Sequence, residues 1–187
     1  MTLMLSQIKA AIIFVVIFSI ITGIIYPLFI TGLGQLFFPF QANGSMLINH
    51  NKIVGSHLIG QHFTLSKYFW GRPSATQPTP YNAINSAGSN LSPTNPELII
   101  AVKSRLDYLL KSHPGSSMPV SLELITASAS GLDPHISVDG ALFQIPRIAQ
   151  QRKISTQALR ELVTKNSEFD NVNVLALNLA LDKLTLS

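Results

Sequence analysis

The sequence predicts a single-pass membrane protein, with one N-terminal transmembrane helix followed by one soluble α+β domain that has long irregular loops. Three observations favour this fold class. Residues 8–30 form a long apolar run in which Lys9 is the only charged residue. Residues 46–187 are enough to form one domain with a hydrophobic core. In that part, short periodic segments alternate with stretches rich in Asn, Ser, Gly and Pro, which are typical of turns.

Residues 8–30 are predicted to cross a membrane as one helix. At about 1.5 Å per residue the run would be about 34 Å long, and a hydrocarbon core is about 30 Å thick. A cleaved signal sequence has a shorter apolar core of roughly 7–15 residues and a small-x-small cleavage site, and no such site precedes Gln41. We therefore expect an uncleaved anchor, with residues 1–7 as a short flank and residues 31–45 as an interfacial linker.

The charges beside the anchor predict its orientation. Lys9 lies on the N-terminal side, whereas residues 31–51 contain no Lys or Arg. Positively charged flanks tend to stay in the cytoplasm. We therefore expect the N-terminus in the cytoplasm and the soluble domain on the extracytoplasmic side.

The anchor also has features suited to contact with a neighbouring helix. Small residues such as Thr22 and Gly23 let two helix backbones approach closely in lipid. Pro27 lacks a backbone N–H and is expected to kink the helix in its outer third. We predict that a partner helix binds Thr22, Gly23, Tyr26 and Pro27.

The first part of the soluble domain is predicted to be a hairpin followed by a long ordered loop. Residues 46–48 and 53–59 have the composition of two short strands. Prolines and glycines rule out a long element over residues 64–96. Aromatic residues in this stretch, including Trp70, argue against disorder because they bury much surface when they pack. We predict an ordered loop that carries recognition.

Helix signals dominate the rest of the domain. Asn95, Ser137 and Ser155 are each suited to cap a helix that follows them. Residues 120–124 alternate as a half-buried strand would. Pro146 is expected to divide one helix into two pieces. The predicted helices span residues 96–111, 138–145, 146–152, 155–166 and 174–184.

Composition excludes several function classes. The net charge of +4 is scattered without a run of Lys or Arg, which does not favour nucleic-acid binding. The absence of Cys excludes disulfides, thiolate nucleophiles and cysteine-ligated zinc. No GxxxxGK[ST] motif is present, so we expect no nucleotide site in this chain alone. The histidines contain no HExxH pair, which predicts no metal site; they are His50, His57, His62, His113 and His135.

The segment TASASGLDPHIS, residues 126–137, has the residue types of a serine hydrolase. Ser128 or Ser130 would be the nucleophile, His135 the base and Asp133 its orienting acid. No Gly-x-Ser-x-Gly elbow surrounds either serine. A local role is the simpler interpretation, in which Asp133 bonds nearby amides in a turn. We assign no catalytic residue and keep the membrane-anchored hydrolase as the alternative.

The segment WGRPSA contains an arginine suited to binding an anion. The guanidinium of Arg72 presents the forked donors that carboxylates and phosphates accept. We predict that Trp70 and Arg72 lie at a partner surface or support one.

Nine segments carry a resemblance to a known family. They are TGxxYP (22–27), ANGS (42–45), VGSHLIGQHF (54–63), YFWGRPSA (68–75), YN (81–82), GSNLSPTNP (88–96), SGLDPHIS (130–137), QIPRIA (144–149) and VNVLALNLALD (172–182). In this colinear order they resemble the C subunit of the bacterial Kdp potassium-transporting ATPase. Two glycines of the family pattern are replaced here by Ala87 and Ala129, which puts the local turn geometry in doubt.

The resemblance implies a non-catalytic subunit of a high-affinity, ATP-driven potassium uptake complex in the bacterial inner membrane. In that family an A subunit conducts potassium, a P-type ATPase B subunit hydrolyses ATP, and a small F peptide accompanies them. The C subunit stabilises the assembly and acts as a catalytic chaperone that raises the ATP affinity of the B subunit. The resemblance implies that partner subunits handle ATP and potassium, and that this chain contacts ATP only in the complex, if at all.

Overall fold

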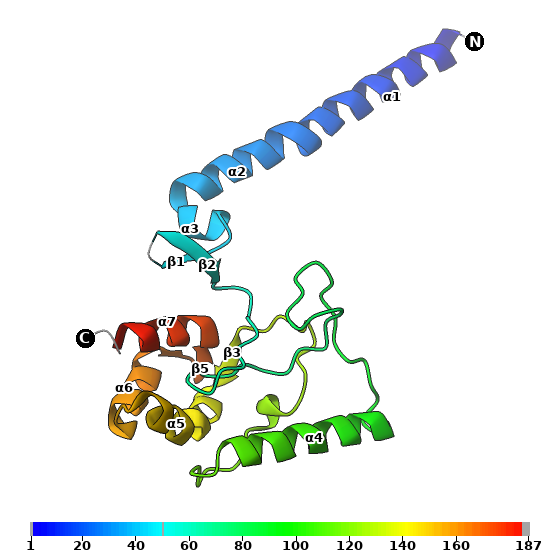
Figure 1. The fold of residues 1–187 in the computed structure, drawn as a ribbon. Helices are drawn as coiled ribbons and strands as arrows, with labels where there is room; N and C mark the ends of the chain where they lie inside the picture. The colour runs from blue at the N-terminus through cyan, green and yellow to red at the C-terminus, as the bar shows by residue number, and fades with distance from the viewer. Residues whose placement is uncertain (1, 50, 185–187) are drawn as a thin grey trace. The chain divides into compact units, whose positions relative to one another are not determined.

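The computed structural model describes residues 2–49 and 51–184 (Figure 1). The chain divides into two compact units between Ser45 and Met46. The first unit is helical, and the second combines helices with short strands.

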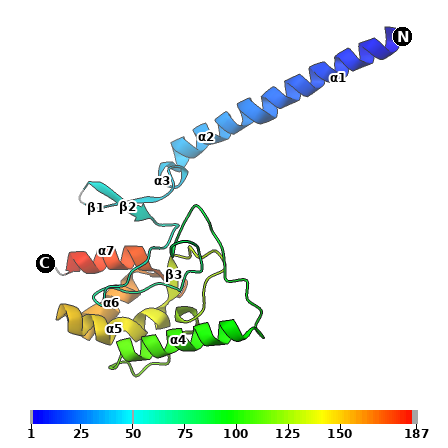
Figure 2. The same cartoon turned by 45° about the vertical axis from the view of Figure 1, so that its right-hand side comes forward.

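The first unit is dominated by one continuous helical segment (Figures 1 and 2). It consists of α1 (Thr2–Ile20), a π-helical turn η1 (Ile21–Ile25) and α2 (Tyr26–Phe37), and a short helix α3 (Pro39–Ala42) follows it. By length and composition, the 32 residues Ser6–Phe37 are able to cross a membrane, and none of them is buried inside the structure. The helix continues beyond residue 30, because a glycine such as Gly32 costs a helix only about 1 kcal/mol.

A widened turn accompanies Pro27. The backbone N–H of Tyr26 donates to the carbonyl of Ile21, five residues earlier, and Pro27 follows at the start of α2. The hydroxyl of Thr22 donates to the carbonyl of Phe18 at 2.7 Å. A π-helical turn of this kind adjusts the backbone next to a residue that lacks a donor. Where a kink was predicted at Pro27, the structure has a π turn within an unbroken helix.

The second unit begins with the predicted hairpin. Strands β1 (Met46–Asn49) and β2 (Lys52–Ser56) pair antiparallel, with Asn49 opposite Lys52. His50 lies outside the described residues. The second strand ends at Ser56 and not at residue 59 as predicted. From residue 57 to residue 95 the chain has no helix or strand, which confirms the irregular stretch predicted from residue 64 onward. Phe69, in the middle of this stretch, is fully buried, which confirms that the loop is ordered and packed.

A second sheet of three short strands was not predicted from the sequence. It consists of β3 (His135–Ser137), β4 (Ser167–Glu168) and β5 (Asn171–Asn173), in the order β3-β5-β4 with antiparallel pairing. β4 and β5 are too short to show an alternating pattern in the sequence. They are joined by Phe169 and Asp170, which both have positive φ, as a tight hairpin turn requires.

The four long helices of this unit are α4 (Pro96–Ser112), α5 (Val138–Arg152), α6 (Thr156–Lys165) and α7 (Val174–Leu184). The predicted caps are confirmed. Asn95 accepts a hydrogen bond from the N–H of Glu97, and Ser137 accepts one from Gly140. Ser155 caps α6 in the same way. These bonds satisfy backbone donors that the first turn of a helix leaves unpaired.

The strand predicted over residues 120–124 is wrong. Leu122–Leu124 form a 3-10 turn instead, with Leu124 buried and Leu122 largely exposed. The carboxylate of Glu123 accepts hydrogen bonds from both the N–H and the hydroxyl of Ser137. This long-range contact decides the local conformation, and the sequence pattern does not show it.

The predicted break at Pro146 is also wrong. Helix α5 runs through Pro146 to Arg152 without interruption. Proline removes one backbone donor from a helix interior. Ile145 and Ile148 on either side are at most 1 % exposed, so burial of this helix against the core offsets the loss.

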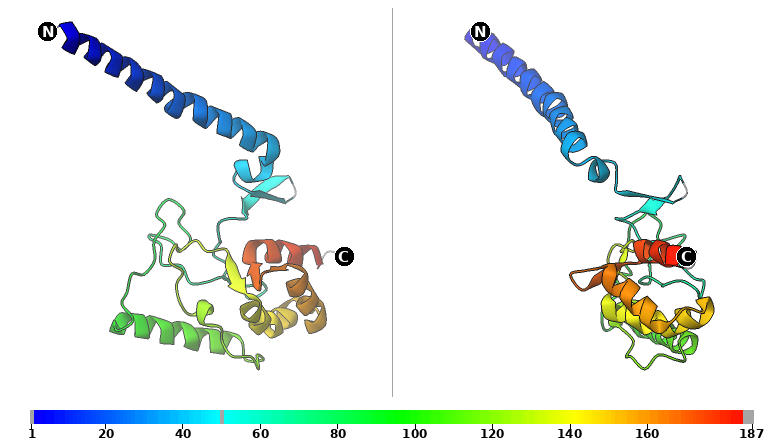
Figure 3. Two further views of the ribbon diagram at one scale, coloured as in Figure 1. Left: turned by 180° about the vertical axis from the view of Figure 1, so that it is seen from behind. Right: turned by 90° about the vertical axis from the view of Figure 1, so that its left-hand side faces the viewer.

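The core of the second unit lies between the helices α5, α6 and α7 and the three-stranded sheet (Figures 1 and 3). Its fully buried members come from the helices, the sheet and the irregular loop. They include Phe69, Ile136, Phe143, Ile148, Leu159, Val163, Leu177 and Leu181. The core thus anchors the irregular loop at Phe69, next to Trp70.

Candidate functional site

The loop around Trp70 is clamped by polar side chains from α5 and α7. Gln144 accepts a hydrogen bond from the N–H of Trp70 at 2.8 Å and donates to its carbonyl at 3.1 Å. Asn178 makes the same pair of bonds with the N–H and carbonyl of Phe69, at 2.9 and 3.0 Å. Each amide side chain therefore replaces a neighbouring strand, which a buried extended segment would otherwise need.

Arg147 completes this clamp from α5. Its guanidinium donates to the carbonyls of Ser66 and Tyr68, to the amide oxygen of Gln144 and to Nε2 of His113. The side chain is only 6 % exposed, and burial lowers the pKa of Arg147 to about 10. Its guanidinium also lies 4.1 Å from the ring centre of Trp70. Sequence reasoning missed these three clamp residues, since polar residues on an amphipathic helix are usually assigned to its solvent face.

Trp70 is held on several sides and stays partly exposed. Its indole N–H donates to the carbonyl of Leu65 at 3.0 Å. Its ring stacks on Tyr108 of α4, with ring centres 5.6 Å apart and an interplanar angle of 18°. The indole is thus fixed as a rigid wall rather than a mobile surface side chain.

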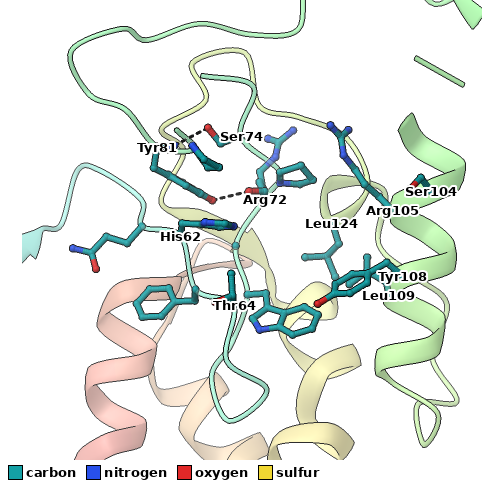
Figure 4. Close-up of a pocket in the computed structure, with 16 residues that line it drawn as sticks. His62, Thr64, Arg72, Ser74, Tyr81, Ser104, Arg105, Tyr108, Leu109 and Leu124 are labelled. Carbon is teal, nitrogen blue, oxygen red and sulfur yellow. Dashed lines mark hydrogen bonds between the residues drawn. The ribbon is translucent and has the colours of Figure 1, made fainter. Parts of the chain in front are cut away.

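A pocket of about 510 Å³ lies between this loop and α4 (Figure 4). Its size is within the range of small-ligand sites. Trp70, Tyr108, Leu109 and Leu124 supply apolar lining, while Arg72 and Arg105 supply the cationic groups. None of the described residues that line it is acidic.

Arg72 enters the pocket from the loop and is oriented by two contacts. Its Nη1 lies 3.0 Å from Oδ2 of Asp133 in an ion pair, with both side chains about one quarter exposed. Tyr81 donates its hydroxyl to the carbonyl of Arg72 at 2.6 Å, and burial, with Asp133 adding to it, raises the pKa of Tyr81 to about 12. Arg72 Nε is buried and makes no hydrogen bond in the described structure. Neither Arg72 nor Trp70 is deeply buried, and their role at a partner surface stays a prediction.

The structure gives no support to the hydrolase alternative. The carboxylate of Asp133 accepts a hydrogen bond from the backbone N–H of His135 at 3.0 Å and forms an ion pair with Arg72. This is the local role expected of Asp133. Ser130 accepts the N–H of Leu132 in the same turn, and Ser128 is buried. Within the described residues, no hydrogen bond joins His135 to either serine.

Two further predictions concern a metal site and a partner helix. In residues 2–49 and 51–184, no three His, Asp or Glu side chains are grouped to hold a metal ion. Thr22 and Gly23 lie in the π turn of the first unit, and Tyr26 and Pro27 begin α2. All four are exposed in the described chain, and their contact with a partner helix stays a prediction.

These features define a class of protein. Among its described residues, one helix is long and apolar enough to span a membrane, and it is joined to a mixed α and β unit that contains a pocket. A family model described as "K+-transporting ATPase, c chain" matches residues 8–183. The chain therefore belongs to the KdpC family of potassium-transporting ATPase subunits.

Relatives along the full chain agree with this assignment. The potassium-transporting ATPase KdpC subunit of Methylococcus capsulatus is 49 % identical over 189 residues, covering 97 % of this chain and 100 % of the relative. The subunit of the same name in a Janthinobacterium species is 48 % identical, covering 96 % and 100 %. That of Dechloromonas aromatica is 44 % identical, covering 97 % and 100 %.

Proposed function

We propose that this chain is the non-catalytic subunit that holds the potassium-conducting A subunit and the P-type ATPase B subunit together, with the small F peptide as a further partner. The family match over residues 8–183 carries this proposal. The exposed apolar helix Ser6–Phe37 supports it, because a long apolar surface needs lipid or protein around it.

The proposed location is the bacterial inner membrane, with the N-terminus in the cytoplasm and the second unit outside. Lys9 on one side of the helix, and no Lys or Arg over residues 31–51 on the other, support this orientation. The helix would contact lipid on one side and a partner helix at Thr22, Gly23, Tyr26 and Pro27.

We further propose that the chain raises the ATP affinity of the B subunit without a nucleotide site of its own. The absence of a GxxxxGK[ST] motif from the sequence supports this. If the second unit lies outside the cytoplasm, it cannot touch cytoplasmic ATP. The effect would then be a coupling between states of the complex, which linkage allows between distant sites.

Replacement of Gly23 by Leu tests the assembly proposal. A Cβ built at Gly23 meets no other side chain within 4 Å in its own chain, so this position of the helix surface is open within the chain. If a neighbouring helix packs there, we expect the variant to lose most of the A and B subunits that co-purify with the tagged wild type in mild detergent.

Gly32→Leu is the matched control. Gly32 is equally open within its own chain and lies roughly half a turn around the helix from Gly23. We expect this variant to retain the partner subunits. Stoichiometric recovery of both subunits with Gly23→Leu would remove the proposed contact face.

The proposed coupling to ATP affinity is tested separately by the KM for ATP, measured for complexes with and without this chain. An unchanged KM would refute the coupling.

A further inference from the structure

The pocket between the irregular loop and α4 has two chemically different ends. Figure 4 shows the head groups of Arg72 and Arg105 at one end, and Tyr108, Leu109 and Leu124 towards the other. We infer that this pocket binds a carboxylate carried on a flat apolar body, with Arg105 as its principal anion-binding group.

The charge balance favours a monoanion. Arg72 and Arg105 together carry two positive charges, and Asp133 offsets one of them through its 3.0 Å ion pair with Arg72. The net charge near the cationic end is therefore about one positive unit, which suits a carboxylate better than a doubly charged phosphate.

The α4 side of the pocket offers no free backbone amides to a phosphate. Phosphate sites commonly use the free amides of a helix N-terminus or a glycine-rich loop. Helix α4 begins at Pro96, whereas its residues at the pocket, such as Ser104 and Tyr108, lie in the middle of the helix. Their N–H groups are used within the helix. Side-chain guanidinium groups are thus the charged donors available at the cationic end.

The guanidinium of Arg105 has N–H donors that are available to a ligand. In the described structure the one hydrogen bond of its guanidinium runs from Nη1 to the carbonyl of Ile125, at 3.1 Å. That bond fixes the direction of the side chain from α4. The remaining N–H donors of its planar group can meet the two oxygens of a carboxylate.

The opposite end fits an apolar body. Trp70 stacks on Tyr108 and uses its only polar atom in the bond to Leu65, so it offers the pocket carbon surface. Leu109 and Leu124 are each at most 5 % exposed and support that surface from behind. An aromatic ring that packs against this surface gains from ring contacts in addition to the area it buries.

Binding of 4-fluorobenzoate to the full-length chain in detergent tests this inference. The ¹⁹F signal of the probe reports binding, and Trp70, the single tryptophan of the chain, reports occupancy of the pocket. We expect saturable binding that moves both signals. 4-Fluorobenzyl alcohol, which has the same ring without the charge, should bind roughly tenfold more weakly.

Variants on α4 assign the binding to Arg105. Arg105→Gln should weaken 4-fluorobenzoate about tenfold or more, and Arg105→Lys by less than that. Lys103→Gln removes a charge from the same helix outside the pocket and should change affinity less than about twofold. Should Arg105→Gln fail to fold, Ser104→Glu places a negative charge on an exposed lining position and should abolish binding.

Three results would overturn the inference. They are no saturable binding up to about 10 mM probe, equal binding of the uncharged alcohol, or equal binding by the Arg105→Gln or Ser104→Glu chain. None of these depends on the proposed assembly, so they separate failure of the pocket from failure of the proposed function.

The assembled complex then distinguishes two sources of the carboxylate, a step that rests on the proposed function. A carboxylate side chain of a neighbouring subunit, together with an aromatic side chain beside it, would fill the pocket. The complex would then no longer bind 4-fluorobenzoate, whereas the isolated chain would. A diffusible organic acid would leave the pocket open to the probe in both.

Discussion

Arg147 and His113 form a hydrogen bond inside the second unit, with Nε of Arg147 2.8 Å from Nε2 of His113. A guanidinium only donates, so Nε2 of His113 accepts and carries no proton. The other ring nitrogen, Nδ1, lies 2.8 Å from the carbonyl of Leu109 and donates to it. This pair of contacts holds His113 as one neutral tautomer.

Stability is expected to fall in mildly acidic solution because of His113. Burial, and then the charge of Arg147, lower the pKa of His113 to about 4, although its bond to Leu109 acts in the opposite direction. The unfolded chain protonates near pH 6.5, so between pH 6.5 and 4 it binds more protons than the folded chain. The contribution of neutral His113 to the free energy of unfolding is fully present above about pH 6.5 and decreases as the pH falls towards 4. Urea midpoints followed by Trp70 fluorescence at pH 8, 6.5 and 5 measure this.

Two histidine variants separate this effect from other titrations. His113→Asn should be less stable at pH 8 and should show a weaker loss between pH 6.5 and 5. His62→Asn, at an exposed side chain, should keep the wild-type pH dependence. A wild-type midpoint that does not change between pH 8 and 5 would contradict the assignment of a neutral buried His113.

Replacement of Arg147 by Met is expected to destabilise the second unit by about 3 kcal/mol or more. The carbonyls of Ser66 and Tyr68 would lose their donor in a partly buried place, and each such loss costs about 1–3 kcal/mol. Trp70 would also lose the cation above its ring, so its emission should shift. Arg160→Met on the exposed surface of α6 is the control. A loss below about 1 kcal/mol would show that Arg147 does not organise the loop.

Gly131→Ala is expected to cost about 2–4 kcal/mol. Gly131 has a φ of +67°, which a side chain disfavours. An added Cβ would lie 2.5 Å from Cγ2 of Thr76 and 2.6 Å from the carbonyl oxygen of Ala87, so the loop would have to shift. In Gly115→Ala the nearest atom is Cβ of Pro146 at 3.4 Å, and φ is not positive there. That control should stay within about 0.5 kcal/mol in the same denaturation measurement. Equal midpoints for the two variants would argue against strain at Gly131.

The two alanines that depart from the family pattern cause no comparable strain. Neither Ala87 nor Ala129 is among the described residues with positive φ. Alanine in place of the family's glycine therefore requires no left-handed backbone conformation at either position.

Local signals in the sequence determined the elements that depend on neighbours along the chain. The apolar run around residues 8–30 predicts the helix that continues to Phe37, because lipid and backbone hydrogen bonding leave few alternatives for such a run. Asn95, Ser137 and Ser155 predict where helices begin, since a cap bonds to amides two or three residues away.

Only the tertiary structure decided the features that depend on distant residues. Glu123 reaches Ser137 and replaces a predicted strand with a turn, and burial of Ile145 and Ile148 carries α5 through Pro146. Arg147, 79 residues from the carbonyl of Tyr68 that it binds, shapes the loop at Trp70 and with it the pocket. Contacts of this kind are stabilised by burial and by charges that only folding brings together. A pattern of residues that are neighbours in the sequence therefore does not predict them.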